Sequence, residues 1–65
     1  MFNGKLLKAE LIMCGISAKE LAKALKMDKS TLSKRINGKS EWTLTEIKKV
    51  GELLGNDAMN KIFLS

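Results

Sequence analysis

A helix-start pattern occurs three times in this chain, and it constrains the fold more than any other feature. The segments Ser17–Glu20 and Thr43–Glu46 are capping boxes, in which the hydroxyl of the N-cap residue accepts from the third helical amide and the glutamate reaches back to the N-cap residue's own amide. Asp28 is a third N-cap candidate, although Thr31 stands where a box would carry glutamate. No alternating β-branched run is present, so the chain is predicted to be all-α.

Those starts, together with glycines that favour helix ends, divide the chain into four to five short helices. The second and third of them are separated by no more than about three residues. A turn that short prevents the two helices from lying antiparallel and forces a steep crossing, as in a helix-turn-helix unit. The expected helices are about Asn3 to Met13, Ala18 to Leu25, Lys29 to Asn37, Leu44 to Leu54, and a last short one from Asn56 or Asp57.

Apolar residues at helical spacing predict the buried face of each helix. Trp42 and Ile47, on either side of the fourth helix start, are expected to form a hydrophobic staple. Cys14 is interpreted as a buried small hydrophobe and not as a redox group. The expected core residues are Leu7, Leu11 and Cys14, then Leu21, Ala22 and Leu25, then Leu32 and Ile36, and then Leu44, Ile47, Val50 (or Gly51) and Leu54.

The chain has 65 residues, which corresponds to one domain over residues 1–65 with a thin core. Small domains often need a disulfide, a metal or a partner subunit. A single cysteine excludes an internal disulfide, and the lack of histidine argues against zinc, so we expect no metal, no cofactor and a homodimer. An apolar C-terminal cluster is expected both to fold back on the first and fourth helices and to cover a twin subunit: Met59, Ile62, Phe63 and Leu64.

The net charge of +5 is unevenly distributed. Residues 1–40 carry nine Lys or Arg against three acids, a net +6, whereas residues 41–65 carry three against four, a net −1. A basic half beside a near-neutral half indicates an anionic partner for the first forty residues, or else a solvated lysine-rich surface.

The third expected helix has an unusual exposed face. On a helical wheel, its short hydroxyls, one amide and two lysines fall within one sector of about 140°. No acid follows the Asp28 cap within this helix, and better helix formers such as Glu and Gln are missing. Such a face suits a phosphate-lined groove, where acids are repelled and hydroxyls or lysines reach base edges. Its members are Lys29, Ser30, Ser33, Lys34 and Asn37.

Four segments together resemble a known family. I-S-A-K-E-L-A (16–22), S-T-L-S-K (30–34), I-N-G-K (36–39) and L-T-E-I (44–47) are similar to the helix-turn-helix of phage Cro/CI-type repressors, the Xre-like group. The resemblance covers about residues 5–55, and the ending K-I-F-L-S resembles small phage regulators of this group. It implies a lambda-repressor-like DNA-binding domain. The chain departs from the family in having Lys26 where glycine is frequent and Arg35 where an apolar residue is frequent.

The resemblance also implies roles for individual residues. The start and exposed face of the third helix would read bases, and the start of the second helix and the segment after the third would bind phosphates. Independently, helix N-termini offer free amides and a positive dipole end to phosphate. The implied base-reading residues are Lys29, Ser30, Ser33 and Lys34, and the implied phosphate-binding residues are Ser17, Ala18 (through its amide), Lys19, Asn37, Lys39 and Ser40.

Two residues stay open at this point. Arg35 has three readings: an ion pair, a phosphate contact or a helix-end cation. Trp42 is interpreted as the staple over the fourth helix in preference to a base-stacking group, because stacking is typical of single-strand binders.

The expected function is therefore a sequence-specific double-stranded DNA-binding regulator, a phage or prophage Cro-like repressor that binds a palindromic operator as a dimer. An antitoxin-type autoregulator and a helical protein-interaction module with a basic face are the alternatives. An enzyme is not expected, because the chain lacks histidine and any phosphate loop. Neither a membrane nor a small-molecule ligand is expected, and the location would be the cytoplasm of a bacterial host, on the nucleoid when bound.

Overall fold

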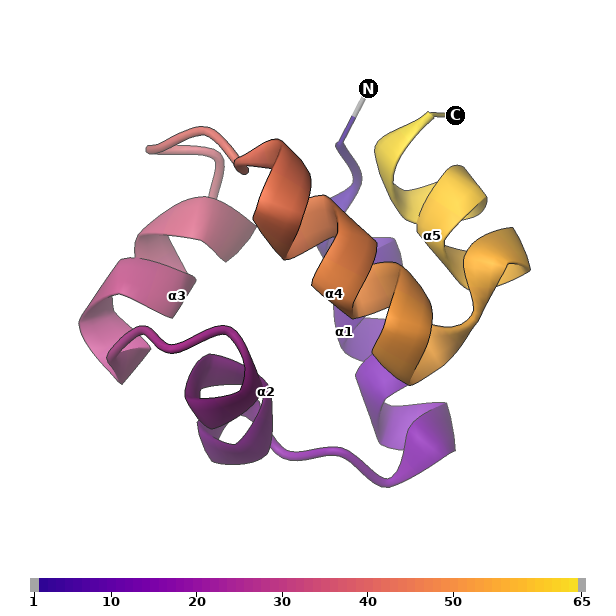
Figure 1. Ribbon diagram of the computed structural model, residues 1–65, viewed down its shortest axis with the longest axis horizontal. Helices are drawn as coiled ribbons and strands as arrows, with labels where there is room; N and C mark the ends of the chain where they lie inside the picture. The colour runs from indigo at the N-terminus through magenta and orange to yellow at the C-terminus, as the bar shows by residue number, and fades with distance from the viewer. Residues whose placement is uncertain (1, 65) are drawn as a thin grey trace.

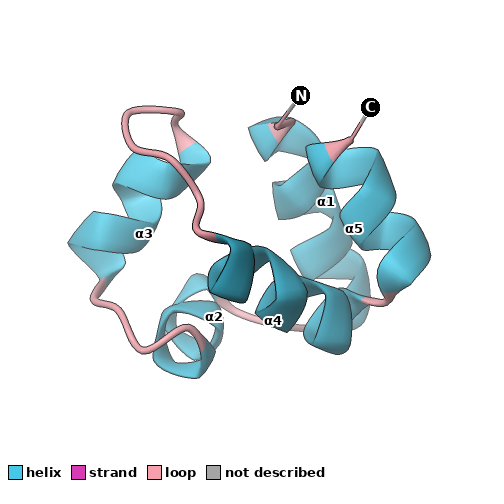
Figure 2. Ribbon diagram, turned by 45° about the horizontal axis from the view of Figure 1, so that its top comes forward, coloured by secondary structure: helices cyan, strands magenta, loops and turns pink. Residues whose placement is uncertain are grey.

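The computed structural model describes residues 2–64, so Met1 and Ser65, the two ends of the expected domain, lie outside the described residues. Within that range the chain forms five helices and no strand (Figures 1 and 2). The prediction of an all-α fold with four to five short helices is confirmed. The helices are α1 (Gly4–Cys14), α2 (Ala18–Ala24), α3 (Lys29–Ile36), α4 (Leu44–Leu54) and α5 (Asn56–Phe63).

Both capping boxes form as the sequence predicts. The Glu20 amide donates to Ser17 Oγ (3.1 Å), and the Ser17 amide donates to Glu20 Oε1 (3.0 Å). The same pair of bonds joins Thr43 and Glu46, at 3.2 and 2.9 Å. Because both amides at each start have partners, α2 and α4 begin where the sequence placed them.

Both ends of α1 and the C-terminal ends of α2 and α3 differ from the expected bounds by one residue, whereas the start of α3, the end of α4 and the start of α5 agree with them. Asn3 lies outside α1 as its N-cap, accepting from the Leu6 amide at 3.1 Å. Gly15 ends α1 with a φ of 69°, a left-handed conformation that glycine adopts without strain. Leu25 and Asn37 were expected inside α2 and α3, and each is instead the residue that caps the helix C-terminus.

The core lies where all five helices meet. In Figure 1, α1 passes behind α4, α5 lies on one side of this pair, and α2 and α3 lie on the other. The second expected helix buries the residues predicted for it, and the third buries Leu32, with Leu21 and Leu32 at 0% and 1% exposure, while Ile36 is half-buried. The buried apolar residues are Leu7, Leu11, Leu21, Ala22, Leu25, Leu32, Val50, Ala58, Ile62 and Phe63.

Two core predictions are wrong, and both concern a helix end. Cys14, the last residue of α1, is exposed, and so are Ile12 and Met13, because the final turn of α1 extends beyond the core. Leu44, the first residue of α4, is 69% exposed. Helical side chains lean toward the helix N-terminus, so a side chain at the first position leans past the packed middle of the helix.

An aromatic cluster joins the two ends of the chain to the loop before α4. The ring centroids of Phe2, Trp42 and Phe63 lie 5.2 to 5.4 Å from one another. The Asn3 amide also donates to the Ile62 carbonyl at 2.7 Å. Trp42 is thus part of the core boundary, half-buried as a staple residue would be.

The C-terminal apolar cluster is divided between core and surface. Ile62 and Phe63 are buried within the chain, and Met59 is half-buried, which confirms the predicted fold-back. Leu64 is 74% exposed. Cover by a twin subunit stays a prediction.

The turn between α2 and α3 is tight and strained. Figure 1 views α2 nearly along its axis while α3 runs in the plane of the view, so the two helices cross steeply. Lys26, in the turn, has a φ of 58°. This left-handed conformation is the one that makes glycine frequent at such a position, and a lysine adopts it at a cost of about 1–2 kcal/mol.

Candidate nucleic-acid interface

The face of α3 that the sequence singled out is open to solvent. All five of its residues are exposed, and no described residue forms a hydrogen bond or an ion pair with the ammonium group of Lys29 or Lys34. The Asn37 side-chain amide donates to Ser33 Oγ at 3.3 Å, which orients two of the polar groups on this face. The face therefore presents two free cations and short hydrogen-bonding groups.

Asp28, the acidic residue that caps α3, forms a hydrogen bond at the start of the helix. Asp28 Oδ1 accepts from the Thr31 amide at 2.7 Å. Hydrogen bonds from Thr31, first from its side chain and then from its backbone, lower the pKa of Asp28, so its carboxylate is ionised at neutral pH. Because the carboxylate points at the first turn, it stabilises α3 without occupying the exposed face.

Buried contacts hold α3 from behind. Leu32 lies in the core and Ile36 packs against it. At the far end, a Cβ on Gly4 would lie 2.5 Å from the Ile36 carbonyl oxygen. The start of α1 therefore approaches the backbone of α3 more closely than any residue with a side chain allows.

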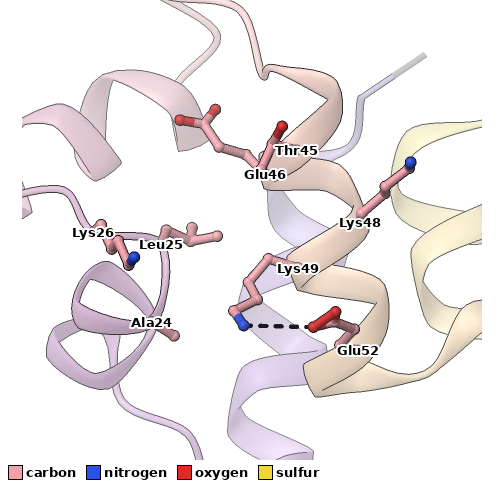
Figure 3. Close-up of a pocket in the computed structure, with 8 residues that line it drawn as sticks. All are labelled: Ala24, Leu25, Lys26, Thr45, Glu46, Lys48, Lys49 and Glu52. Atoms are coloured by element: carbon pink, nitrogen blue, oxygen red, sulfur yellow. Dashed lines mark hydrogen bonds and ion pairs between the residues drawn. The ribbon is translucent and has the colours of Figure 1, made fainter.

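The structure decides between the readings of Arg35. Its Nε and terminal nitrogen donate to the two carboxylate oxygens of Glu46, at 3.0 and 3.2 Å, and its other terminal nitrogen donates to Ser40 Oγ at 2.7 Å. The Arg35 and Glu46 side chains are only 18% and 14% exposed. Arg35 is an ion pair that ties α3 and the following loop to the start of α4, and in Figure 3 the Glu46 carboxylate points toward α3.

That pairing also acts on Glu46 itself. The hydrogen bond from Arg35 is the largest cause that lowers the pKa of Glu46, ahead of the backbone bond from Thr43. Glu46 thus serves two partners, as the box residue of α4 and as the counter-ion of Arg35. The sequence revealed the first role and not the second, because nothing local to Glu46 indicates that α3 ends beside it.

The expected phosphate-binding residues lie at two separate places. Ser17, Ala18 and Lys19 are exposed at the start of α2. The Ser17 amide donates to Glu20 and Ser17 Oγ accepts from the Glu20 amide, so the Ser17 O–H can still donate. Among the described residues, the amides of Ala18 and Lys19 have no hydrogen-bond acceptor.

The second place is the segment after α3. The Lys39 side chain is exposed, while its amide donates to the Lys34 carbonyl at 2.9 Å. Ser40 Oγ accepts from Arg35, which leaves its own O–H to donate elsewhere. This segment therefore keeps one free cation and one hydroxyl donor close to the C-terminal end of α3.

Two surface hollows differ in the charges that line them. One lies between the end of α2 and α4 and carries both signs, including the Lys49–Glu52 ion pair at 3.5 Å (Figure 3). The other lies between α1 and α3 and is lined by Lys8 and Lys29 with no acid. Sequence reasoning missed Lys8, and no local signal points to it, because only the tertiary fold brings α1 beside α3.

The described residues contain no group of His, Cys, Asp and Glu that could hold a metal ion. No helix among residues 2–64 combines the length and the apolar character needed to cross a bilayer. A family model described as helix-turn-helix matches residues 7–58, which is most of the chain. The comparisons with curated proteins and with solved structures each returned no match.

Proposed function

Because the chain belongs to the Cro/CI-type (Xre-like) helix-turn-helix family of DNA-binding regulators, we propose that it is a phage or prophage repressor of the Cro type. One observation carries this proposal further than family membership does. The exposed face of α3 has two ammonium groups that form no hydrogen bond or ion pair within residues 2–64, and it has no acid beyond the cap residue, which is the composition that suits a phosphate-lined groove.

In the proposed mechanism α3 enters the major groove and α2 crosses the backbone. Lys29 and Lys34 donate to acceptors such as guanine O6 and N7, and Ser30 and Ser33 bond to base edges within shorter reach. The Asn37–Ser33 bond holds Ser33 in place before DNA arrives, so less side-chain freedom is lost on binding.

Phosphate contacts would fix the register of α3 on both sides of the groove. At the start of α2 they come from Ser17, the Ala18 amide and Lys19, and after α3 they come from Asn37, Lys39 and Ser40. These contacts position the protein without reading sequence, since every nucleotide carries the same phosphate. The Arg35–Glu46 pair supports the second group by holding the loop that carries Lys39 and Ser40.

The size of one subunit supports the proposal of a homodimer on a palindromic operator. The longest extent of the molecule is 26 Å, whereas half-sites one helical turn apart are separated by about 34 Å. One subunit therefore reaches one half-site, and two linked copies gain affinity without any new kind of contact. Exposed apolar side chains are available for pairing, among them Ile12, Met13 and Leu64. Neither a cofactor nor a small-molecule ligand is part of the proposal, which places the protein on DNA in a bacterial cytoplasm.

Selection of preferred duplexes from a random pool tests this function. We expect the recovered sequences to be palindromic, with half-site centres about one helical turn apart. Affinity for the selected duplex should also fall steeply and linearly on a plot of log affinity against log salt concentration. A pool that shows no enrichment would favour a protein-interaction module whose basic face meets an acidic partner.

A further inference from the structure

The acid-free hollow between α1 and α3 shares residues with the reading face. Its volume is about 240 Å³. Lys29, Ser33 and Asn37 line one side, and Lys8 is the only residue of α1 that lines it. A duplex that touches the exposed face of α3 therefore also reaches this hollow.

The charges around the hollow are unbalanced. Lys8 and Lys29 are both exposed, and neither ammonium group has a hydrogen bond or an ion pair within residues 2–64. Two like charges that border one concavity repel each other, and the repulsion is weakened by an anion placed between them. The hollow between α1 and α3 thus favours a negatively charged group.

The apolar lining of the hollow indicates what kind of anion fits. It comes from Ala18, which is exposed, from Ile36, which is half-buried, and from Leu32, which is almost fully buried. A sugar–phosphate unit has an apolar side on its sugar and an anionic phosphate beside it. The hollow therefore matches the backbone of a nucleic acid better than it matches an isolated, fully hydrated ion.

We infer that Lys8 binds a backbone phosphate of the operator, on the strand that borders the α1 side of α3. The deoxyribose of that nucleotide would rest against Ile36 and Ala18. This contact makes α1 a third DNA-binding element beside α2 and α3. The inference rests on the proposed function, since it requires that α3 lies in the major groove.

The test compares two lysine-to-alanine variants of the full chain, Lys8→Ala and Lys48→Ala. Each removes one exposed positive charge, but Lys48 lies on α4 and points toward α5 (Figure 3). Binding of each protein to the selected duplex and to a random duplex of equal length is measured as a function of salt concentration. Thermal unfolding, followed by the fluorescence of Trp42, checks that both variants fold like the wild type.

We expect Lys8→Ala to flatten the plot of log affinity against log salt by about 0.9, the contribution of one phosphate contact. If the lines converge near 1 M salt, the affinity at 0.1 M falls about eightfold, equally for both duplexes. Lys8→Arg should restore the wild-type slope because it keeps the charge. Lys48→Ala should change the slope by much less than one contact.

Single phosphates replaced by uncharged methylphosphonates then locate the contact. The wild type and Lys48→Ala should lose affinity at one phosphate where Lys8→Ala shows no further loss. Equal salt slopes for the Lys8 and Lys48 variants, on a duplex that the wild type prefers, would overturn this inference alone. A wild-type protein without any duplex preference would overturn the proposed function and this inference with it.

Discussion

Lys34 and Arg35 are neighbours in α3, yet their cations have different surroundings. The Lys34 side chain is exposed and unpaired within the described residues, whereas Arg35 donates to Glu46 and Ser40. All three guanidinium nitrogens of Arg35 donate to these two residues, so few of its N–H groups remain to bind a phosphate. At the scale of the residue, the partner and not the charge separates the structural cation Arg35 from Lys34, which we propose binds DNA.

The division between reading and phosphate-binding residues can be tested by truncation. Lys34→Ala and Ser30→Ala should each reduce discrimination between the selected and a random duplex by about 1–3 kcal/mol, because each loses a base contact. Lys39→Ala should weaken binding to both duplexes alike and flatten the salt slope by about one unit. Equal losses on both duplexes for all three variants would contradict this division.

The strained turn residue offers a gain in stability. Lys26→Gly should raise the free energy of unfolding by about 0.5–1 kcal/mol, because release of the left-handed strain exceeds the added backbone entropy of the unfolded chain. Lys23→Gly, three residues earlier and inside α2, should instead lower it by about 1 kcal/mol. Urea unfolding measures both. A loss of stability in Lys26→Gly would mean that the lysine side chain contributes more than its strain.

At the scale of the element, α4 differs from α2 in what its capping box does. Both boxes satisfy two amides at a helix start. The glutamate of the α4 box additionally holds Arg35, so the start of α4 is joined to the end of α3. The local pattern is the same in both boxes, and the added role comes from the neighbouring helix.

Glu46→Gln isolates the ion pair, because glutamine still serves in a capping box. Glu20→Gln is the matched control, since Glu20 belongs to a box without an arginine. At pH 7 the melting temperature should fall further in Glu46→Gln than in Glu20→Gln. Circular dichroism at several pH values measures the difference.

The difference should depend on pH in a defined direction. The pKa of Glu46 in the folded protein lies below its unfolded value of about 4.3, so the unfolded state takes up the proton more readily. The stabilisation is fully present above about pH 4.3 and is lost as the pH falls through the folded pKa. The two variants should therefore converge in acid, and a gap that does not narrow as the pH falls would rule out the ion pair as its cause.

At the scale of the whole molecule, the position of α3 depends on segments that are distant in sequence. Gly4 allows α1 to approach the last carbonyl of α3, and Trp42 connects the loop after α3 to both chain ends. Trp42 Nε1 is buried and has no hydrogen-bond partner within the described part of the chain, so packing among these residues and not polar bonding holds the indole there. The position of the exposed face of α3 is thus set by contacts that other parts of α3 and the loop after it make with the rest of the chain.

Gly4→Ala should destabilise the fold by about 1–3 kcal/mol, because its Cβ would meet a backbone oxygen that cannot move alone. Gly51→Ala is the contrasting change, since the Cβ there would lie 3.4 Å from the flexible ends of Asn56 and Met59. It should stabilise α4 by up to about 1 kcal/mol through helix propensity. Thermal unfolding compares the two, and similar effects in both variants would contradict the close approach of α1 to α3.

How far the sequence predicts the structure varies with the range of the interaction. The capping boxes, the buried face of α2 and the exposed face of α3 were all predicted, because each depends on residues within a few positions of one another. The burial expected for Cys14 and Leu44 was wrong. Helical periodicity predicts which side of a helix faces the core, but it does not predict how far along that helix the neighbouring helices extend. Arg35 stayed open, because its partner lies eleven positions away.

By itself, then, the sequence determined the starts of α2, α3 and α4, the crossing of α2 and α3, and a polar face on α3 without acids. Hydrogen bonds and side-chain spacing within a few residues are sufficient to specify these features. Only the tertiary structure decided that Arg35 is a structural cation, that Trp42 joins the chain ends, and that Lys8 borders the same hollow as Lys29. Those features arise where separate helices meet, and the distances between helices are set by the packing of the whole core and not by any local pattern.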